Sequence, residues 1–283
     1  MLWDFHPVMP LLFGHRGLFG TMEKFPYELR GFQYILFYHD APAELEIWFW
    51  SSVSAATLGL VGLATRLSFL LTYLAMFLFR ERDPFMTFGA DLVMNCIGLW
   101  LLFLDSGRAW AIDNVLWRRC EISDDGQVEF WPVRAIQIQV ALIYLVTGLK
   151  KLPTTPWQDG SAVYYALQVG NIIKGQPPSW ILGHRALLAF MNYGTLFVEI
   201  SVPFMLFYRP LRVWAFALCI LMHTGIDLFM SIRFFSLTMY LGFLSFLDSA
   251  DWDRCAHGFR KLVSLRCVTH LRRSRGRYRA LRR

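Results

Sequence analysis

The sequence has few charged residues, and this shortage excludes most soluble proteins. Asp, Glu, Lys and Arg make up 17% of the 283 residues, whereas soluble domains contain about 25%. Apolar residues make up 55% and aromatic residues 17%, so the chain has ample apolar surface to bury and is not a disordered polar chain. This composition predicts an all-α fold, a polytopic bundle of transmembrane helices.

Several motifs of soluble and secreted proteins are also missing. The five cysteines form no C-x-x-C pair, which argues against a zinc or disulfide framework. Gly14, Gly17 and Gly20 follow no strand-like run, so they do not indicate a dinucleotide loop. The first twenty residues lack the basic start and apolar core of a signal peptide. We expect no metal site in this chain.

Positive charge is concentrated in the C-terminal tail, residues 249–283. Eleven Lys and Arg lie between Arg254 and Arg283 without any acid, while the rest of the chain has 17 basic and 21 acidic residues. Basic tails stay on the cytoplasmic side of a membrane and attract anionic lipid heads. No nucleic-acid-binding motif accompanies the charge, so the tail predicts membrane lipid as a partner and no nucleic acid.

Seven apolar stretches are candidates for membrane spans, which need about 20 helical residues each. They cover residues 46–65, 67–79, 85–104, 130–148, 186–208, 213–230 and 234–247. They predict a transmembrane domain over 46–248, with 152–185 as an external or re-entrant loop. With an odd number of spans and a cytoplasmic tail, the N-terminal segment 1–45 is expected on the outer side of the membrane. The membrane itself is expected to be the plasma (inner) membrane.

Ionisable residues within these spans mark function by default, because they are costly in lipid. The candidates are Glu199, His223 and Asp227 within spans and Lys151 at the end of one, with Asp91 as a possible fifth. Lys151 ends a span and could simply extend to the interface. Glu199 must be neutral or paired with a cation such as Lys151 or Arg233. His223 and Asp227 share a helix face at i, i+4, which fits a structural polar pair as well as a functional one.

Two sequence blocks carry a family resemblance. Residues 147–167 read Thr-Gly-Leu-Lys-Lys-Leu-Pro-Thr-Thr-Pro-Trp-Gln-Asp-Gly-Ser-Ala-Val-Tyr-Tyr-Ala-Leu, and His223 is followed by Arg-Phe-Phe-Ser-Leu-Thr-Met from position 233. Two shorter matches support these blocks. A Trp-Ala-Ile-Asp run at 110–113 precedes both of them, and Val198-Glu199 lies between them. Over residues 40–250 the chain resembles the vitamin K-dependent γ-carboxylase-like HTTM proteins.

The resemblance implies a specific chemistry. Lys151 matches the lysine that acts as a base toward reduced vitamin K, with Lys150 as the alternative lysine. Oxygenation of the quinol then supplies a stronger base, which removes a γ-proton from a glutamate before carbon dioxide adds. The implied cofactor is a reduced quinone of the vitamin K type, and the implied substrate a secreted peptide. His223 is the second catalytic residue, supported by Trp157, Gly160, Glu199, Asp227 and Asp91.

The chain departs from the family pattern in three ways. First, carboxylases have a catalytic histidine near the start of the helix that precedes the matching Leu104-Asp105, whereas this stretch contains Asp91 and no histidine. Second, the large domain with which carboxylases dock their substrate has no counterpart here. Third, the family's first helix would lie before Met1. Two functions therefore remain open. One is a carboxylase-like membrane enzyme, a lyase or oxidoreductase. The other is a non-catalytic factor for maturation or for lipid or quinone binding, with a structural ion network.

Overall fold

The described parts of the chain are helical, as the composition predicted. The structure, a computed structural model, describes residues 6–9, 41–82, 89–104, 107, 111–116, 130–170, 172–232, 234–248 and 251. Most of the N-terminal segment and of the basic tail, and Arg233, therefore lie outside the described residues. The described part contains no strand beyond one isolated β-bridge, between Ile173 and Met230. The all-α fold class is confirmed.

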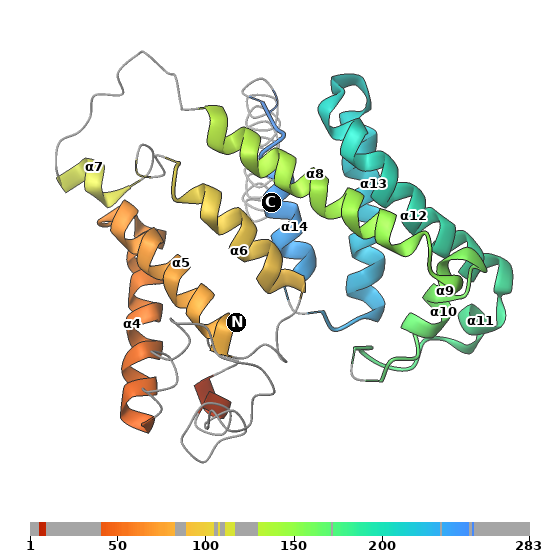
Figure 1. Ribbon diagram of the computed structural model, residues 1–283, viewed down its shortest axis with the longest axis horizontal. Coiled ribbons are helices and arrows are strands. Elements are labelled where there is room, and N and C mark those ends of the chain that lie inside the picture. The colour runs from red at the N-terminus through yellow and green to blue at the C-terminus, as the bar shows by residue number, and fades with distance from the viewer. Residues whose placement is uncertain are drawn as a thin grey trace, which may run out of the picture.

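Within the described residues, seven longer helices follow one another, with short helices between or before them (Figure 1). The longer ones are α4 (Pro42–Val61), α5 (Thr65–Arg82), α6 (Gly89–Leu101), α8 (Phe130–Lys151), α12 (Arg185–Phe207), α13 (Arg209–Phe229) and α14 (Phe235–Leu244). The short ones are a 3-10 turn (His6–Val8), α7 (Ile112–Leu116), α9 (Thr155–Gln158), α10 (Ala162–Ala166) and α11 (Ser179–Gly183). Each predicted span overlaps one of the longer helices.

Three of these helices are long and apolar enough to cross a bilayer. They are Trp131–Lys151, Arg185–Phe207 and Arg209–Phe229, with 21, 23 and 21 residues. At 1.5 Å rise per residue they are about 31–35 Å long, against about 30 Å of hydrocarbon. Gly89–Leu101 and Phe235–Leu244 are apolar but shorter. The protein is therefore an integral membrane protein, and the remaining four predicted crossings stay predictions.

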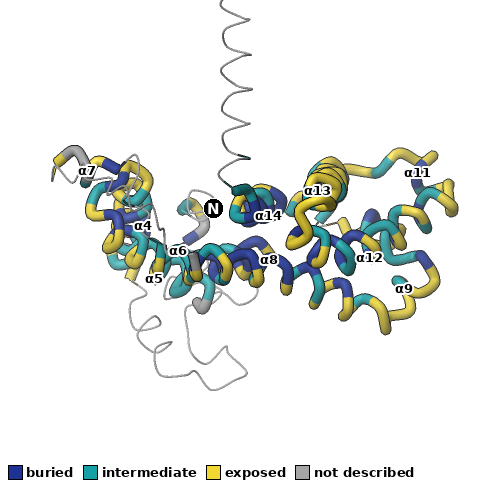
Figure 2. The backbone as a smooth tube through the Cα atoms, turned by 90° about the horizontal axis from the view of Figure 1, so that it is seen from above, coloured by how far each residue is buried: buried dark blue, intermediate teal, exposed yellow. Residues whose placement is uncertain are grey.

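α8 is the central helix of the molecule. It packs against α6, α12 and α14, while α13 packs against α12 and α14, and α4 and α5 form a hairpin whose α5 meets α6. Seen from above, the described helices form a flat, elongated array (Figure 2). Buried positions are prominent along α8 and α14, whereas α13 is largely exposed. An exposed apolar face is expected where a helix meets lipid.

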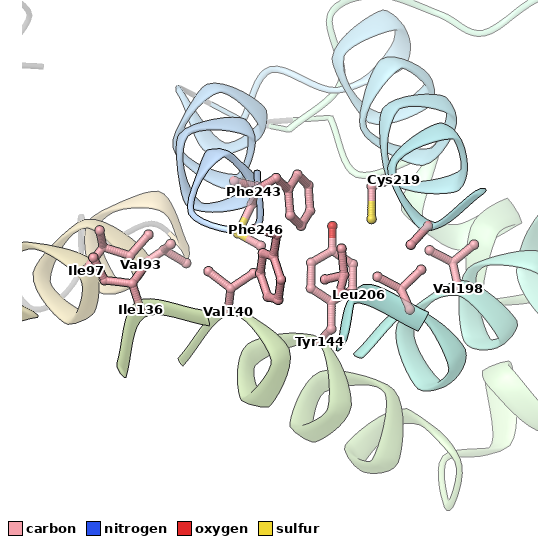
Figure 3. Packing of buried hydrophobic residues seen from close by; sticks show 13 residues of the cluster. Val93, Ile97, Ile136, Val140, Tyr144, Val198, Leu206, Cys219, Phe243 and Phe246 are labelled. Atoms are coloured by element: carbon pink, nitrogen blue, oxygen red, sulfur yellow. The ribbon is translucent and has the colours of Figure 1, made fainter. Parts of the chain in front are cut away.

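The core lies where α8 meets α6, α12, α13 and α14 (Figure 3). Gly242 of α14 lets these helices approach closely, because a Cβ there would lie 2.8 Å from Cγ2 of Val140 and 3.3 Å from Cδ1 of Ile97. Small residues at helix crossings favour such contacts in membranes. The buried members are Val93, Ile97, Ile136, Val140, Tyr144, Val198, Val202, Leu206, Ala215, Cys219, Met239, Phe243 and Phe246.

The turn between α12 and α13 is tied to the end of α14 by charge. Arg209 donates a hydrogen bond to the carboxylate of Asp248, and Arg212 donates to the carbonyl of Phe246 at 2.8 Å. The hydrogen bond from Arg209 lowers the pKa of Asp248 to about 2. This pair therefore stays charged at any physiological pH.

Candidate functional site

Lys151 and Glu199 form an ion pair between α8 and α12. Nζ of Lys151, the last residue of α8, contacts Oε1 of Glu199 near the middle of α12. The Glu199 side chain is 9% exposed and that of Lys151 28%. Of the alternatives open for Glu199, the structure has the pairing with Lys151, while Arg233 lies outside the described residues.

Gly148 brings the two helices close enough for this pairing. A Cβ at Gly148 would lie 3.0 Å from Cβ of Glu199 and 3.1 Å from Cγ1 of Ile200. A side chain at this position would therefore crowd α12, whose atoms would have to shift by a few tenths of an ångström. The Gly-Leu-Lys-Lys run therefore has a structural reason for its glycine, three residues before the paired lysine.

The indole of Trp157 covers the ammonium of Lys151. The centre of the ring lies 4.6 Å from Nζ, within the range of a cation–π contact, which contributes about 0.5–2 kcal/mol depending on desolvation. Trp157 belongs to the one-turn helix α9, which follows α8 after a short turn. Lys151 is thus held on one side by a carboxylate and on another by an aromatic face.

Lys150, the alternative lysine, takes no part in these contacts. Its side chain is exposed, and neither the ion pair with Glu199 nor the ring contact with Trp157 involves it. The geometry therefore singles out Lys151 among the two neighbouring lysines.

Gly160 forms the turn that follows α9. It is buried and has φ +81°, a left-handed conformation that glycine adopts without strain. A Cβ at this position would lie 3.3 Å from the hydroxyl oxygen of Tyr193 on α12. The glycine thus allows the loop to lie directly on α12 beside the Lys151 site.

His223 on α13 is hydrogen-bonded to Tyr144 on α8. Nε2 of the histidine lies 2.7 Å from the tyrosine hydroxyl, and the His223 side chain is almost fully buried. Its ring is also packed against Phe235 and Tyr240, with centroids 5.4 and 5.6 Å away. Tyr144 precedes Lys151 by seven residues, so both lie on the same face of α8, about 10 Å apart along its axis.

Asp227 and His223 do not form the hydrogen-bonded pair that their spacing allowed. Asp227 accepts a hydrogen bond from Ser236 of α14 at 2.7 Å, and Nδ1 of His223 has no partner among the described residues. Each residue is instead bonded to a different helix. The pair holds α13 to α8 through Tyr144 and to α14 through Ser236.

A backbone clamp joins the loop after Lys151 to the end of α13. Lys174 donates its backbone N–H to the carbonyl of Phe229 at 3.0 Å, and the bridge between Ile173 and Met230 lies beside this bond. The ammonium of Lys174 also contacts the carbonyl oxygen of Asp227. The loop is therefore fixed to the helix that carries His223.

Asp91 lies near the beginning of α6 and is buried. Gly89, two residues earlier, faces the ring of Phe235, because a Cβ at Gly89 would lie 3.5 Å from Cε2 of that ring. Since Phe235 also contacts His223, this end of α6 lies on the His223 side of the core. The ion pair of Lys151 does not include Asp91.

Five side chains each have one buried polar atom without a partner among the described residues. These atoms are Oδ1 of Asn95, Nε1 of Trp100, Oδ1 of Asn192, Oε2 of Glu199 and Nδ1 of His223. Buried polar atoms without partners are rare and call for an explanation such as a ligand. Carboxylate oxygens accept hydrogen bonds, so Oε2 of Glu199, beside Lys151, is chemically suited to a hydroxyl group of a quinol. In the described part of the chain, His, Cys, Asp and Glu form no group of three that could hold a metal.

Sequence reasoning missed Tyr144 and Asn192. Tyr144 lies within an apolar run and Asn192 near the start of a span, and neither carries a charge that would mark it. A signal was available for both, because each precedes a predicted site residue by seven positions, Tyr144 before Lys151 and Asn192 before Glu199. Seven residues are two helical turns, so the members of each pair share a helix face.

Comparison with known families agrees with the resemblance in the sequence. The HTTM domain matches residues 9–252, which include both sequence blocks and every residue of the site. No solved structure matches the chain. Since the match extends over most of the sequence, the chain is a member of the HTTM domain family of membrane proteins.

Proposed function

We propose that the protein is a carboxylase-like membrane enzyme in which Lys151 is the base for a quinol-dependent oxidation or carboxylation. The substrate class is a secreted peptide or another molecule that reaches the site from outside the cell. The observation that carries this proposal is the contact between Lys151 and the nearly buried Glu199.

The ion pair offers a route to a neutral lysine. Transfer of one proton from Nζ of Lys151 to Oε1 of Glu199 leaves an amine and a carboxylic acid, both uncharged. Burial disfavours charged groups more than neutral ones, so a closed site supports this transfer. The neutral amine of Lys151 could then act as a base toward a hydroxyl group of the quinol, as general-base catalysis requires.

A reduced quinone of the vitamin K type, when bound, would supply the two electrons for the reduction of molecular oxygen, the co-reactant whose reaction with the quinol would yield the stronger base. Glu199 would hold it through its unpaired oxygen, Oε2, and the Trp157 ring would offer an apolar surface. His223, fixed through Nε2 by Tyr144, would exchange a proton at Nδ1.

A second function is favoured by the same cluster of charges. Lys151 has a carboxylate and an aromatic face as neighbours, which is also how a permanent cation is stabilised in a helix bundle. In that case the protein is a non-catalytic maturation or lipid- and quinone-binding factor, and Lys151, Glu199, His223 and Asp227 form a structural network.

Consumption of reduced quinone by membranes that contain the protein distinguishes the two functions. Lys151→Arg keeps the positive charge beside Glu199, but its guanidinium cannot lose a proton. The enzymatic function predicts a loss of about 100-fold or more in turnover for Lys151→Arg, Lys151→Ala and His223→Ala, and near wild-type turnover for Lys150→Ala. Full activity of Lys151→Arg would exclude lysine as the base.

The wild-type protein provides the remaining test. If it consumes no quinol with any supplied peptide, the enzymatic proposal is wrong. The structural network then predicts that the double exchange Lys151→Glu and Glu199→Lys still yields a folded protein, because the opposite charges are preserved.

We also propose that all seven longer helices cross a plasma membrane, with the N-terminal segment outside and the basic tail in the cytoplasm. The proposal is supported by the overlap of each helix with a predicted span and by the distribution of Lys and Arg. Residues 152–185, and with them the open end of the Lys151 site, then face outward, where a secreted peptide would arrive.

A further inference from the structure

Helix α12 holds the turn that carries Trp157 at two adjacent points. Nδ2 of Asn192 donates a hydrogen bond to the carbonyl of Trp157 at 3.0 Å. The hydroxyl of Tyr193 donates to the carbonyl of Gln158 at 2.8 Å. The last carbonyls of a helix have no partner within it, so the one-turn helix α9 depends on such donors from outside.

The two donors differ strongly in burial. Asn192 is fully buried, whereas 48% of the surface of Tyr193 is exposed. Water can replace the Tyr193 hydroxyl, but it cannot easily replace a donor in the interior, where an unpaired carbonyl is costly. Asn192 is therefore the anchor of the turn.

The side-chain amide of Asn192 contributes a hydrogen-bond donor, Nδ2, in addition to its packing. Its Oδ1 has no partner among the described residues, a cost that an apolar side chain of similar size would avoid. What the amide provides in return is the hydrogen bond to the Trp157 carbonyl. That bond fixes the backbone from which the indole extends over the ammonium of Lys151.

We propose that Asn192 is a positioning residue for Lys151 and acts through Trp157. By holding the Trp157 backbone, it keeps the indole over Nζ and limits the access of other molecules to the lysine. The inference rests on the proposed function only in taking Lys151 as the reactive lysine. Its geometric content, that Asn192 controls the access to Lys151, can be tested without any substrate.

The test is the rate of reductive methylation of individual lysines in the full-length protein in detergent. Formaldehyde with cyanoborohydride is the probe, and fragment mass spectra distinguish Lys151 from Lys150. We expect Lys151 to react more slowly than Lys150 in the wild type. In Asn192→Leu and Asn192→Asp, which lose the amide donor, we expect methylation of Lys151 to become about fivefold faster, with Lys150 unchanged.

Thr195→Ala is the matched control on the same helix. It removes a hydrogen bond from Oγ1 of Thr195 to the carbonyl of Met191, inside α12, and should leave the ratio of Lys151 to Lys150 methylation at its wild-type value. A general loosening of the protein would accelerate both lysines together and would contradict the proposal. So would an unchanged Lys151 rate in both Asn192 variants.

The result is independent of catalysis. If the Asn192 variants do not alter Lys151 methylation while Lys151→Arg abolishes quinol consumption, the positioning role is wrong and the proposed function stands. If Asn192 controls the methylation of Lys151 but the wild type consumes no quinol, the positioning role stands and the proposed function fails.

Discussion

At the scale of single residues, the site depends on a charge pair that is largely removed from water. Removing one partner from such a pair leaves the other charge unpaired, whereas replacing both with apolar residues is often nearly neutral. Lys151 is 28% exposed on its side chain and Glu199 9%. Because the pair is partly exposed, a single substitution should lower the free energy of unfolding less than it would for a fully buried pair, but still measurably.

A double-mutant cycle on this pair is therefore informative. We expect Lys151→Met and Glu199→Leu each to destabilise the protein, by about 2 kcal/mol, and the double variant to be more stable than either. The measurement is Tm of the purified protein in detergent, with Lys150→Met as a control that should leave Tm unchanged. Strictly additive losses in the double variant would show that the two charges do not depend on each other.

The hydroxyl of Tyr144 is the second residue-scale feature with a measurable effect. Tyr144→Phe leaves Nε2 of the nearly buried His223 without its partner at 2.7 Å, which we expect to cost about 1–3 kcal/mol. Tyr240→Phe is the matched control, because Tyr240 packs against the same ring at 5.6 Å without hydrogen-bonding to it. Equal Tm values for the two variants would argue against a role for the Tyr144 hydroxyl.

At the scale of elements, the turn after α9 is the sensitive part of the segment 152–185. Gly160→Ala puts a Cβ on a residue with φ +81° and 3.3 Å from the Tyr193 hydroxyl. The left-handed conformation alone costs roughly 1–2 kcal/mol for such a residue. We expect a lower Tm and faster methylation of Lys151, because α9 and Trp157 shift together.

Gly170→Ala provides the comparison in the same segment. A Cβ at Gly170 would meet no atom within 4 Å, and its φ is not in the left-handed range. This variant should behave like the wild type in both measurements. If Gly160→Ala does so as well, the turn is more tolerant than its geometry implies.

At the scale of the whole molecule, the orientation in the membrane decides which solution the Lys151 site meets. In a variant without the five native cysteines, we expect Gly170→Cys to react with an impermeant maleimide in intact cells. Tyr208→Cys, beyond the other end of the 23-residue helix α12, should react only after permeabilisation. The reverse pattern would place the site in the cytoplasm and exclude a secreted peptide as its substrate.

The sequence predicted the positions of the longer helices well, and their ends less well. The second span was expected at 67–79, but α5 extends over Thr65–Arg82, because Arg80 and Glu81 continue the helix without adding to its apolar run. Likewise α8 continues to Lys151, beyond the expected end at 148. Apolar runs indicate what is buried in lipid, whereas helices end where hydrogen bonding ends.

Part of the site was also predictable. An acid inside a span must be neutral or paired, so the sequence could name Lys151 as one of two possible cations for Glu199, with Arg233 as the other. The contacts of Tyr144 with His223 and of Asn192 with Trp157 could not be predicted, because each joins segments separated by 79 and 35 residues. Such contacts depend on which helices lie next to each other in the bundle. No local pattern in the sequence encodes which helices are neighbours.

The place of Lys151 at the very end of α8 has a consequence for biosynthesis. The chain is made from its N-terminus, so α8 enters the membrane before Glu199, its partner 48 residues later, has been synthesised. During this interval an ammonium in the middle of a span would be stranded in hydrocarbon. At the last position of the helix it can stay among the lipid head groups until α12 arrives, and the charge is then enclosed only when its counter-charge is already present.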